Sequence, residues 1–359
     1  MIRAFAIVVV LVSFLGCGKE ETRTQELDRE VENFISAVDI SSYPEIETSG
    51  VRFYDLENDE DGFLSILKGN GVNTIRLRLW VHPKNQHSGF DEVKEFSRIL
   101  KTYGFKIWLT LHYSDTWADP GHQVPPSRWQ GIGFTALKDS VYQYTARIVN
   151  QIHPDFVQIG NEINSGFLHP MGSVDNLHQF KELLNSGIAA VRNNTTSTQL
   201  VMHYAGIKGA EWFFKQIDEL DYDIIGLSYY PLWHGKDLDD LRIALQQLSA
   251  KHDKNVVIAE TAYPFTLGYN DWTNNVVGLE DQLILPEFPA TPKGQRDFVR
   301  AVKEIVLNEA ARGIGFCYWG GELISWKGKQ AQNASSWENQ ALFDFENKAL
   351  PVLREFQLE

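Results

Sequence analysis

The chain has 359 residues, of which 43% are hydrophobic, a length that suits one large α/β barrel or two domains of ordinary size. Its 33 Lys and Arg against 47 Asp and Glu give a net charge of −14, which argues against a nucleic-acid partner because polyanions need basic grooves. Two cysteines are too few for a disulfide scaffold or a thiolate zinc site. The ten tryptophans indicate stacking surfaces, for which sugars are the usual ligands.

The first 32 residues predict an export signal and a tether. Residues 1–16 carry one positive charge and about a dozen mostly apolar residues, too few for a comfortable membrane span. The segment resembles a bacterial lipoprotein signal, although Phe14 and Leu15 depart from the usual pattern, and this implies that Cys17 becomes a lipidated N-terminus. Residues 18–32 are charged and lack an apolar face, so residues 17–32 are expected to form the lipidated cysteine and a flexible tether. Because residues 18–21 are similar to the acidic export signal of surface lipoproteins, we expect an anchor at the outer membrane or cell surface of a Gram-negative bacterium.

From residue 33 onward the chain alternates short apolar runs with longer amphipathic stretches. The runs have strand length, and most have the apolar composition of strands buried on both faces. Eight of them are expected as strands: Asn33–Ile40, Val72–Leu79, Phe105–Leu111, Phe156–Gly160, Gln199–His203, Asp223–Ser228, Val256–Ala259 and Ile314–Trp319. Helices are expected over Glu92–Tyr103, Phe134–Ile152, Asn176–Asn193, Leu238–Lys251 and Pro292–Gly313.

Eightfold β/α alternation predicts a (β/α)8 TIM barrel that occupies residues 33–359 as a single domain. An open doubly wound sheet is the alternative, and it is disfavoured because no glycine-rich phosphate loop follows the first strand. Two extended loops, Tyr113–Phe134 after strand three and Tyr263–Thr291 after strand seven, follow strand C-termini, where barrel enzymes build their sites.

Two groups of residues at these strand ends point to carbohydrate chemistry. Eight tryptophans fall at or after strand C-termini, as expected of platforms for sugar rings: residues 80, 117, 129, 233, 272, 319, 326 and 337. Glu162 closes strand four and Glu260 closes strand seven, so the two can face each other across the mouth of the barrel. Cleavage of a glycosidic bond needs such a pair, one carboxyl as proton donor and the other as nucleophile or general base.

Other catalytic chemistries lack their motifs. None of the ten histidines forms an H-x-H or H-E-x-x-H pattern, and no serine lies in a G-x-S-x-G elbow. His112, His203 and His234 fall near strand ends, where a hydrogen bond to a sugar hydroxyl and a structural role are both open.

Several segments resemble glycoside hydrolase family 53, the arabinogalactan endo-β-1,4-galactanases of the retaining barrel clan. They are residues 71–83, 107–120, 157–164, 226–235, 258–264 and 315–322, in barrel order. The Ser-Asp-Thr-Trp-Ala-Asp-Pro and Tyr-Tyr-Pro-Leu-Trp-His-Gly stretches are specific to that family, whereas Asn161-Glu162 is shared by the clan. The resemblance implies an endo-acting hydrolase of β-1,4-galactan, with galactan or type I arabinogalactan as the binding partner of a protein that we expect to be a monomer.

The resemblance also implies roles for individual residues. Glu162 would be the acid/base and Glu260 the nucleophile, with their carboxyl groups about 5–5.5 Å apart. Arg76 would keep Glu260 charged, and Tyr229 would touch it. Asn161 would bind the sugar 2-hydroxyl, and Trp319 would form the floor of subsite −1. The expected substrate-binding residues are Arg76, His112, Asp115, Trp117, Asp119, Asn161, Tyr229, Trp233, His234 and Trp319.

A calcium ion occurs in some bacterial members, in an Asp-rich loop after strand seven. Here the loop spans Phe265–Asn275 and has a single carboxylate, so we expect no cofactor and no metal; Asn270 or Asn274 would be the ligands of any calcium bound there. A β-mannanase or β-glucanase would share both glutamates. A non-catalytic glycan-binding lipoprotein would need neither of them.

Overall fold

The computed structural model describes residues 34–358, and Ile35 begins a compact unit that continues to the C-terminal end. Its eight parallel strands close into a barrel in the order β1-β10-β9-β8-β7-β6-β5-β4, as predicted. The barrel strands are β1 Ile35–Asp39, β4 Thr74–Leu79, β5 Lys106–Leu111, β6 Phe156–Ile159, β7 Gln199–Ala205, β8 Ile224–Ser228, β9 Asn255–Thr261 and β10 Gly313–Trp319. A small antiparallel pair, β2 Phe53–Tyr54 and β3 Glu60–Asp61, lies outside the barrel.

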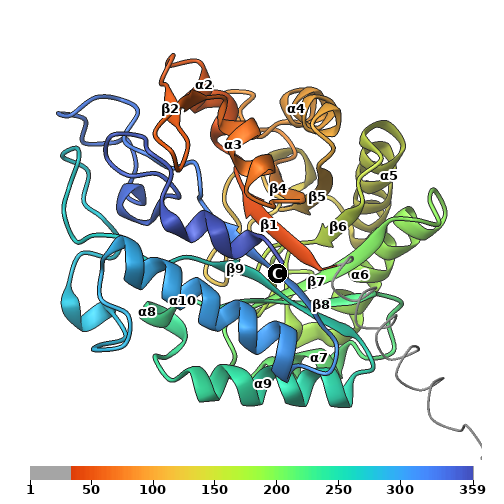
Figure 1. Ribbon diagram of the computed structural model, residues 1–359. Helices are drawn as coiled ribbons and strands as arrows, with labels where there is room; N and C mark the ends of the chain where they lie inside the picture. Colours follow the sequence, from red (N-terminus) through yellow and green to blue (C-terminus); the bar gives the residue numbers. More distant parts are fainter. Residues whose placement is uncertain (1–33, 359) are drawn as a thin grey trace, which may run out of the picture. The chain divides into compact units, whose positions relative to one another are not determined.

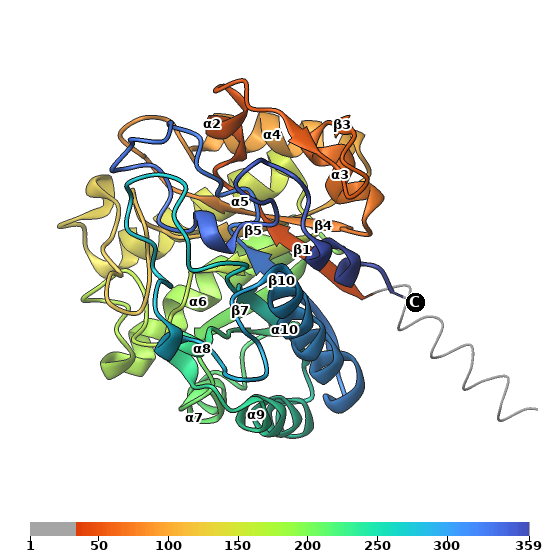
Figure 2. The same cartoon turned by 60° about the vertical axis from the view of Figure 1, so that its left-hand side comes forward.

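Helices surround the barrel in chain order (Figures 1 and 2). The α-helices are α2 Tyr43–Glu47, α3 Phe63–Gly69, α4 Phe90–Thr102, α5 Phe134–Ile152, α6 Leu177–Arg192, α7 Ala210–Gln216, α8 Pro231–His234, α9 Leu238–Lys251 and α10 Pro292–Glu304. The helix expected over Pro292–Gly313 is shorter, because α10 passes into a π-helical turn, Ile305–Glu309, before β10. Within residues 34–358, none of the helices combines the length and apolar character needed to cross a membrane.

The barrel interior has an apolar layer beneath a polar one. Buried side chains of alternate strand positions form the apolar layer: Ile35, Ala37, Trp108, Phe156, Val201, Ile224, Val257, Ala259 and Cys317. Successive strand residues point to opposite faces, so the next inward position along a strand lies two residues further on. In β1 and β4 these positions are Asp39 and Arg76, which are also paired in the strand register. The fold therefore brings polar side chains to the C-terminal mouth of the barrel.

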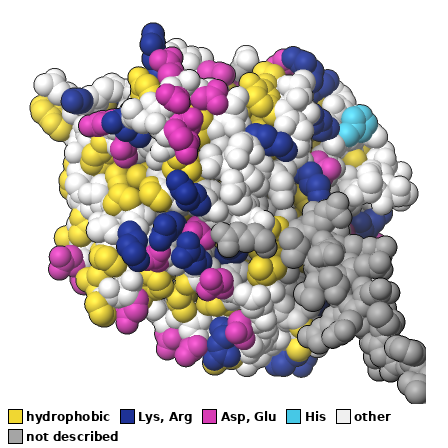
Figure 3. All heavy atoms as spheres, viewed as in Figure 1, with side chains coloured by type: hydrophobic (Ala, Val, Ile, Leu, Met, Phe, Trp, Pro, Cys, Tyr) yellow, Lys and Arg dark blue, Asp and Glu magenta, His cyan; other side chains and the backbone are white. Residues whose placement is uncertain are grey.

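Long loops extend from that mouth. The expected insertions after β5 and β9 are present, since helix α5 begins at Phe134 and helix α10 at Pro292. A third long segment, between β10 and the 3₁₀ helix Pro351–Phe356, was not predicted. On the face shown in Figure 3, Lys and Arg side chains are interspersed with Asp and Glu. The predicted signal, Cys17 and the tether lie outside the described residues.

Barrel closure between β1 and β10 depends on a glycine. Gly315 has φ = 154°, a conformation that L side chains rarely adopt, and a Cβ there would overlap the carbonyl oxygen of Ile35. We predict that Gly315→Ala lowers the free energy of unfolding by at least about 1–3 kcal/mol, the usual cost of such backbone strain. Denaturant titration measures the change. Gly69→Ala is the control, because no atom lies within 4 Å of its added methyl group, and its stability should not fall. Equal stability of the two variants would contradict this account of the closure.

Candidate active site

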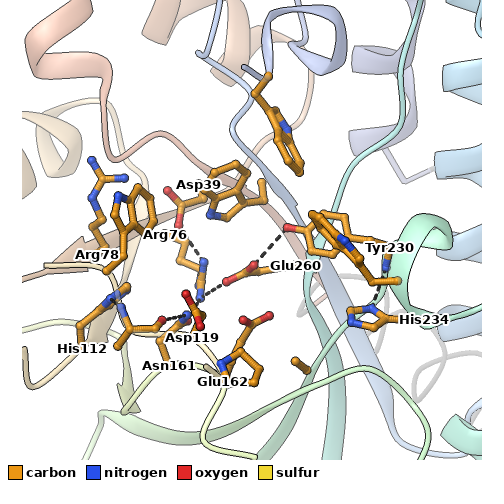
Figure 4. Close-up of a pocket in the computed structure, with 17 residues that line it drawn as sticks. Asp39, Arg76, Arg78, His112, Asp119, Asn161, Glu162, Tyr230, His234 and Glu260 are labelled. Atoms are coloured by element: carbon orange, nitrogen blue, oxygen red, sulfur yellow. Dashed lines mark hydrogen bonds and ion pairs between the residues drawn. The ribbon is translucent and has the colours of Figure 1, made fainter. Parts of the chain in front are cut away.

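Arg76 is the central cation of the mouth and is almost completely buried. Its Nη1 donates to Oδ2 of Asp39 at 2.8 Å, and its Nη2 donates to Oε1 of Glu260 at 2.8 Å and to Oδ1 of Asn161 at 3.0 Å (Figure 4). Burial by itself would lower the pKa of Arg76, but Glu260 and Asp39 raise it overall. The guanidinium therefore stays charged and joins residues of β1, β9 and the loop after β6.

Glu260 enters the cavity because β9 is irregular. The β8–β9 register pairs Leu227 with Ile258 but Ser228 with Glu260, so β9 has one extra residue at this point. Such a bulge changes the face to which the next side chain points. Without it, Glu260 would follow the inward-facing Ala259 and point toward the helices. The bulge thus delivers the carboxylate to Arg76.

Glu162 is positioned by a strained turn after β6. Its φ is 47°, a left-handed conformation that is uncommon for residues other than glycine. The turn is held by His203 of β7, whose Nδ1 accepts from the Glu162 backbone N–H at 3.3 Å and whose carbonyl accepts from Ile163 N–H at 3.0 Å. Strain of this kind persists only where surrounding contacts enforce it, and it concentrates at functional sites.

The two carboxyl groups have different electrostatic surroundings. Burial, followed by the charge of Glu260, raises the pKa of Glu162 to about 8. Burial also raises the pKa of Glu260, while the Arg76 cation and the hydroxyl of Tyr230, which donates to Oε2 at 3.0 Å, act against this rise. Only Glu260 has an ion pair with Arg76, so the negative charge of the pair resides on Glu260 and the proton on Glu162. The site thus holds an acid and a carboxylate at the same pH.

Carboxylate oxygens of Glu162 and Glu260 lie within 4.8 Å of one another. Pairs of catalytic carboxyl groups in glycosidases are about 5–5.5 Å apart when the second is a nucleophile, and about 6.5–9.5 Å when a water lies between them. The observed proximity agrees with the shorter spacing. The arrangement can therefore support attack by one carboxylate and proton donation by the other.

A cavity of about 510 Å³ opens above this pair and has a row of indoles along its wall. Trp117, Trp233, Trp319 and Trp337 all line it, and Trp117 and Trp233 are 43% and 55% exposed. Ring centroids of Trp117 and Trp319 are 6.0 Å apart, and those of Trp319 and Trp337 are 4.8 Å apart. Exposed indoles beside a carboxylate pair are suited to stacking on sugar rings.

Arg78 supports one end of this row. Its guanidinium carbon lies 4.2 Å from the ring centroid of Trp117 and 4.8 Å from that of Trp80. The side chain is buried and donates from Nε to Ser88 and from Nη2 to His87, both at 2.8 Å. The hydrogen bonds fix the guanidinium, and the cation–π contact holds Trp117 over it.

Most of the expected site residues meet around the cavity. Its lining includes both glutamates and eight of the ten expected binding residues: Arg76, His112, Trp117, Asp119, Asn161, Trp233, His234 and Trp319. Burial lowers the pKa of His112 well below its usual value and that of His234 to about 4, so both rings are neutral at neutral pH.

Two expected residues lie elsewhere. The prediction that the Tyr229 side chain touches the Glu260 carboxyl group is wrong: its hydroxyl donates to the carbonyl of Gly235 at 2.8 Å, and the hydroxyl that reaches the carboxylate is that of Tyr230. Tyr229 contacts Glu260 through the backbone, where its N–H donates to the Glu260 carbonyl oxygen at 2.8 Å. Asp115 is not among the cavity-lining residues; its Oδ2 accepts from the backbone N–H of Ser127 at 2.9 Å and from its hydroxyl at 2.7 Å. Asp115 thus braces the loop after β5, and its contact with substrate stays a prediction.

The tryptophan prediction is only partly correct. Four of the eight rim indoles line the cavity, as described above. Trp80 is buried behind Trp117, and Trp129 packs on Tyr113 and Tyr144. Trp272 and Trp326 are not among the lining residues. A strand-end position therefore places an indole near the mouth but does not place it in the cavity.

Several residues of the site were not predicted from the sequence, namely Asp39, Arg78 and Tyr230 in the cavity wall and Gln158 and Ser228 behind it. Strand alternation could have found most of them. Asp39, Gln158 and Ser228 each occupy an inward position two or four residues after a member of the apolar layer, and Tyr230 continues the inward series of β8. Trp337, one of the eight tryptophans expected at the rim, comes from the long segment after β10.

The loop after β9 does not fit calcium well. Its carboxylate, Asp271, is buried and accepts from Thr273 N–H through Oδ1 and from the Ser325 hydroxyl through Oδ2. The backbone N–H of Asn270 donates to Glu338, a second buried carboxylate that comes from the segment after β10. Protein donors thus occupy both carboxylate oxygens of Asp271 and Oε1 of Glu338, which leaves Oε2 of Glu338 without a hydrogen-bond partner, whereas a hard cation needs several oxygen ligands. We retain the expectation that the protein uses no cofactor or metal.

Among residues 34–358, one group of three side chains has ligand atoms close enough to consider for a metal: Glu162, His203 and Glu260. The Arg76 guanidinium, 2.8 Å from Glu260, would repel a cation, and Nδ1 of His203 already accepts the backbone N–H of Glu162. This group is better suited to proton chemistry than to metal binding.

Comparison with known proteins agrees with this geometry. The profile of glycosyl hydrolase family 53 matches residues 35–356. The chain belongs to glycosyl hydrolase family 53. It is 35% identical to the arabinogalactan endo-beta-1,4-galactanase of Cellvibrio japonicus, over 91% of both chains, and 31% identical to the endo-beta-1,4-galactanase of Bacillus subtilis, over 90% of this chain and 86% of that protein. The solved structure of the Ignisphaera aggregans GH53 catalytic domain superposes with a TM-score of 0.85 at 37% identity, covering 91% of this chain and 96% of that one.

The correction from Tyr229 to Tyr230 leads to a prediction. Tyr230→Phe removes the hydroxyl that donates to Glu260 and should lower kcat for glycoside hydrolysis roughly 10- to 150-fold, because a hydrogen bond to a charged group contributes about 1.5–3 kcal/mol. Tyr229→Phe is the matched control and should change kcat less than about threefold. Steady-state kinetics of the two purified variants tests the assignment, and a larger loss in the Tyr229 variant would refute it.

Proposed function

We propose that the protein is an endo-β-1,4-galactanase that hydrolyses galactan and type I arabinogalactan with retention of configuration. The observation that carries the proposal is the carboxyl pair, in which oxygens of a protonated Glu162 and an Arg76-bound Glu260 lie within 4.8 Å beneath a row of indoles. The names of the relatives from Cellvibrio japonicus and Bacillus subtilis support β-1,4-galactan as the substrate.

The geometry assigns the steps of the reaction. Glu260 attacks the anomeric carbon of the sugar in subsite −1, while Glu162 transfers its proton to the departing glycosidic oxygen. In the second step Glu162 takes a proton from water, whose oxygen bonds to the anomeric carbon and displaces Glu260. Arg76 and Tyr230 hold Glu260 in position for attack, and Asn161 is available to the sugar 2-hydroxyl. Trp319 is proposed as the floor of subsite −1, with Trp117 and Trp233 as platforms further along the chain of sugars.

Substrate choice is tested by incubation with potato galactan, β-mannan and cellulose oligomers, with products resolved by size. We expect galactose and short galacto-oligosaccharides from galactan alone. Products from mannan or cellulose instead would favour the β-mannanase or β-glucanase alternative, since both share the two glutamates. Binding of galactan without any product would favour a glycan-binding lipoprotein.

Two alanine variants separate the roles of the glutamates. Glu260→Ala should lose activity on every substrate, because no glycosyl-enzyme can form. Glu162→Ala should lose at least about 10²–10⁴-fold on galactan, whose leaving sugar needs a proton, but should still cleave aryl galactosides with good leaving groups. Added azide should then restore turnover of Glu162→Ala and give β-galactosyl azide. The opposite products, β-galactosyl azide from Glu260→Ala and α-galactosyl azide from Glu162→Ala, would reverse the assignment.

We further propose that Cys17 is lipidated and anchors a monomeric enzyme at the outer membrane or cell surface of a Gram-negative bacterium. The apolar run before Cys17 and the charged residues 17–32 support this location. Cys17→Ala should release the protein from the membrane fraction without changing its turnover in solution. A variant that still sediments with membranes would remove the anchor from the proposal.

A further inference from the structure

Glu162 is connected to two buried side chains of neighbouring strands. The hydroxyl oxygen of Ser228, at the end of β8, lies 2.6 Å from Oε1 of Glu162. Nε2 of His203, in β7, lies 2.9 Å from that same hydroxyl oxygen. Both side chains are completely buried. Glu162, Ser228 and His203 thus form a hydrogen-bonded chain, and the roles described above do not require it. The inference drawn from this chain rests on the proposed role of Glu162 as acid/base.

The surroundings of His203 fix the position of its ring proton. The backbone N–H of Glu162, which cannot rotate, is directed at Nδ1 at 3.3 Å. The amide nitrogen of Gln158 lies 3.0 Å from Nδ1, and its orientation is set by a second hydrogen bond to the carbonyl of Gly160. Oδ1 of Asn161 is 3.2 Å from Nδ1 but already accepts from the Arg76 guanidinium at 3.0 Å. Nδ1 is therefore an acceptor, and the proton of the neutral ring is on Nε2.

The direction of the remaining hydrogen bonds follows. Because Nε2–H of His203 donates to the Ser228 oxygen, the Ser228 hydroxyl proton is directed at Oε1 of Glu162. Oε1 is thus an acceptor in both protonation states of Glu162. Within residues 34–358, no hydrogen bond reaches Oε2 of Glu162, and the carboxyl group faces the cavity beside Glu260 (Figure 4).

We propose that Ser228 and His203 are positioning residues that place the catalytic proton of Glu162 on Oε2, the oxygen open to the glycosidic bond. In the first step this proton leaves Oε2 for the departing sugar oxygen. In the second step Oε2 takes one proton from the attacking water, which restores the acid. Ser228 and His203 donate hydrogen bonds throughout and transfer no proton, so the chain is the same at the start and end of the cycle.

The charged groups around Glu162 come from three elements: Glu260 on β9, Arg76 on β4 and Asp119 in the loop after β5. Burial and then Glu260 raise the pKa of Glu162, whereas the hydrogen bond from Ser228 lowers it because it stabilises the carboxylate. Removal of the Ser228 hydroxyl should therefore raise this pKa further. Glycosylation needs protonated Glu162, so activity is lost as pH rises through its pKa, and the loss should occur at higher pH in the variant.

The test compares Ser228→Ala and Ser228→Thr with the unchanged protein. The Glu162 carboxyl is titrated by ¹³C NMR of protein labelled at glutamate Cδ, with its signal assigned by its loss in Glu162→Gln. We expect Ser228→Ala to raise the pKa of Glu162 by about one pH unit. The pH at which kcat/KM falls on the alkaline side of its pH profile should rise by the same amount, and kcat should fall about tenfold. Ser228→Thr keeps a hydroxyl, so the pKa of Glu162 and the alkaline fall of kcat/KM should both stay as in the unchanged protein.

Ser249→Ala is the matched control, since Ser249 is also buried but donates to the carbonyl of Gln246 in helix α9. An unchanged Glu162 pKa in Ser228→Ala would contradict the proposal, because it would show that Ser228 only fills space beside Glu162. A lowered pKa would show that Glu162 donates to Ser228, and the chain would run in the opposite direction. The titration needs no substrate, so its result stands even if galactan is not hydrolysed, an outcome that would count against the proposed function alone.

Discussion

The site depends on one buried cation, Arg76. Removing a guanidinium from water is costly unless carboxylates balance its charge and acceptors take its N–H groups. Loss of one partner of a buried ion pair strongly destabilises the folded protein, because it leaves an uncompensated charge. Asp39 and Glu260 supply two carboxylates at 2.8 Å, from strands β1 and β9, which are separated by β10 in the barrel. The same contacts that make the burial of Arg76 tolerable also fix the position and charge of Glu260. Structural stability and the position of the Glu260 carboxylate are therefore coupled through the Arg76 side chain.

That cation also explains how two chemically identical side chains acquire different roles. Glu260 shares the Arg76 charge and remains the carboxylate, whereas Glu162 has a hydroxyl as its hydrogen-bond donor and retains a proton to higher pH. Their proximity increases the difference, because ionisation of one disfavours ionisation of the other. Bulk water would weaken the interactions among the charges of Arg76, Glu260 and Glu162. The burial of this polar layer above the apolar interior therefore maintains the difference between the two carboxyl groups.

The indoles proposed to bind the substrate lie in less regular parts of the chain. Trp117 and Trp337 belong to long segments after β5 and β10, and each is held by a contact from elsewhere. The Arg78 guanidinium lies against Trp117, and Trp337 packs edge-on against Trp319 at the end of β10. The carboxyl pair lies at the ends of barrel strands, with Glu260 in β9 and Glu162 in the turn after β6, while the loops provide an apolar wall that can vary in length and shape without disturbing the pair.

The sequence alone determined the eight strands, the barrel and the two glutamates, because strands buried on both faces appear as continuous apolar runs and catalytic side chains follow their C-terminal ends. Strand alternation would also have identified Asp39 and Tyr230, and its neglect led to the error at Tyr229. Only the tertiary structure decided the rest. Alternation directs Glu260 away from the cavity, and a bulge that exists only in the pairing of β8 with β9 turns it inward. The left-handed turn at Glu162 likewise depends on His203, which is 41 residues away in sequence and adjacent only in the folded barrel.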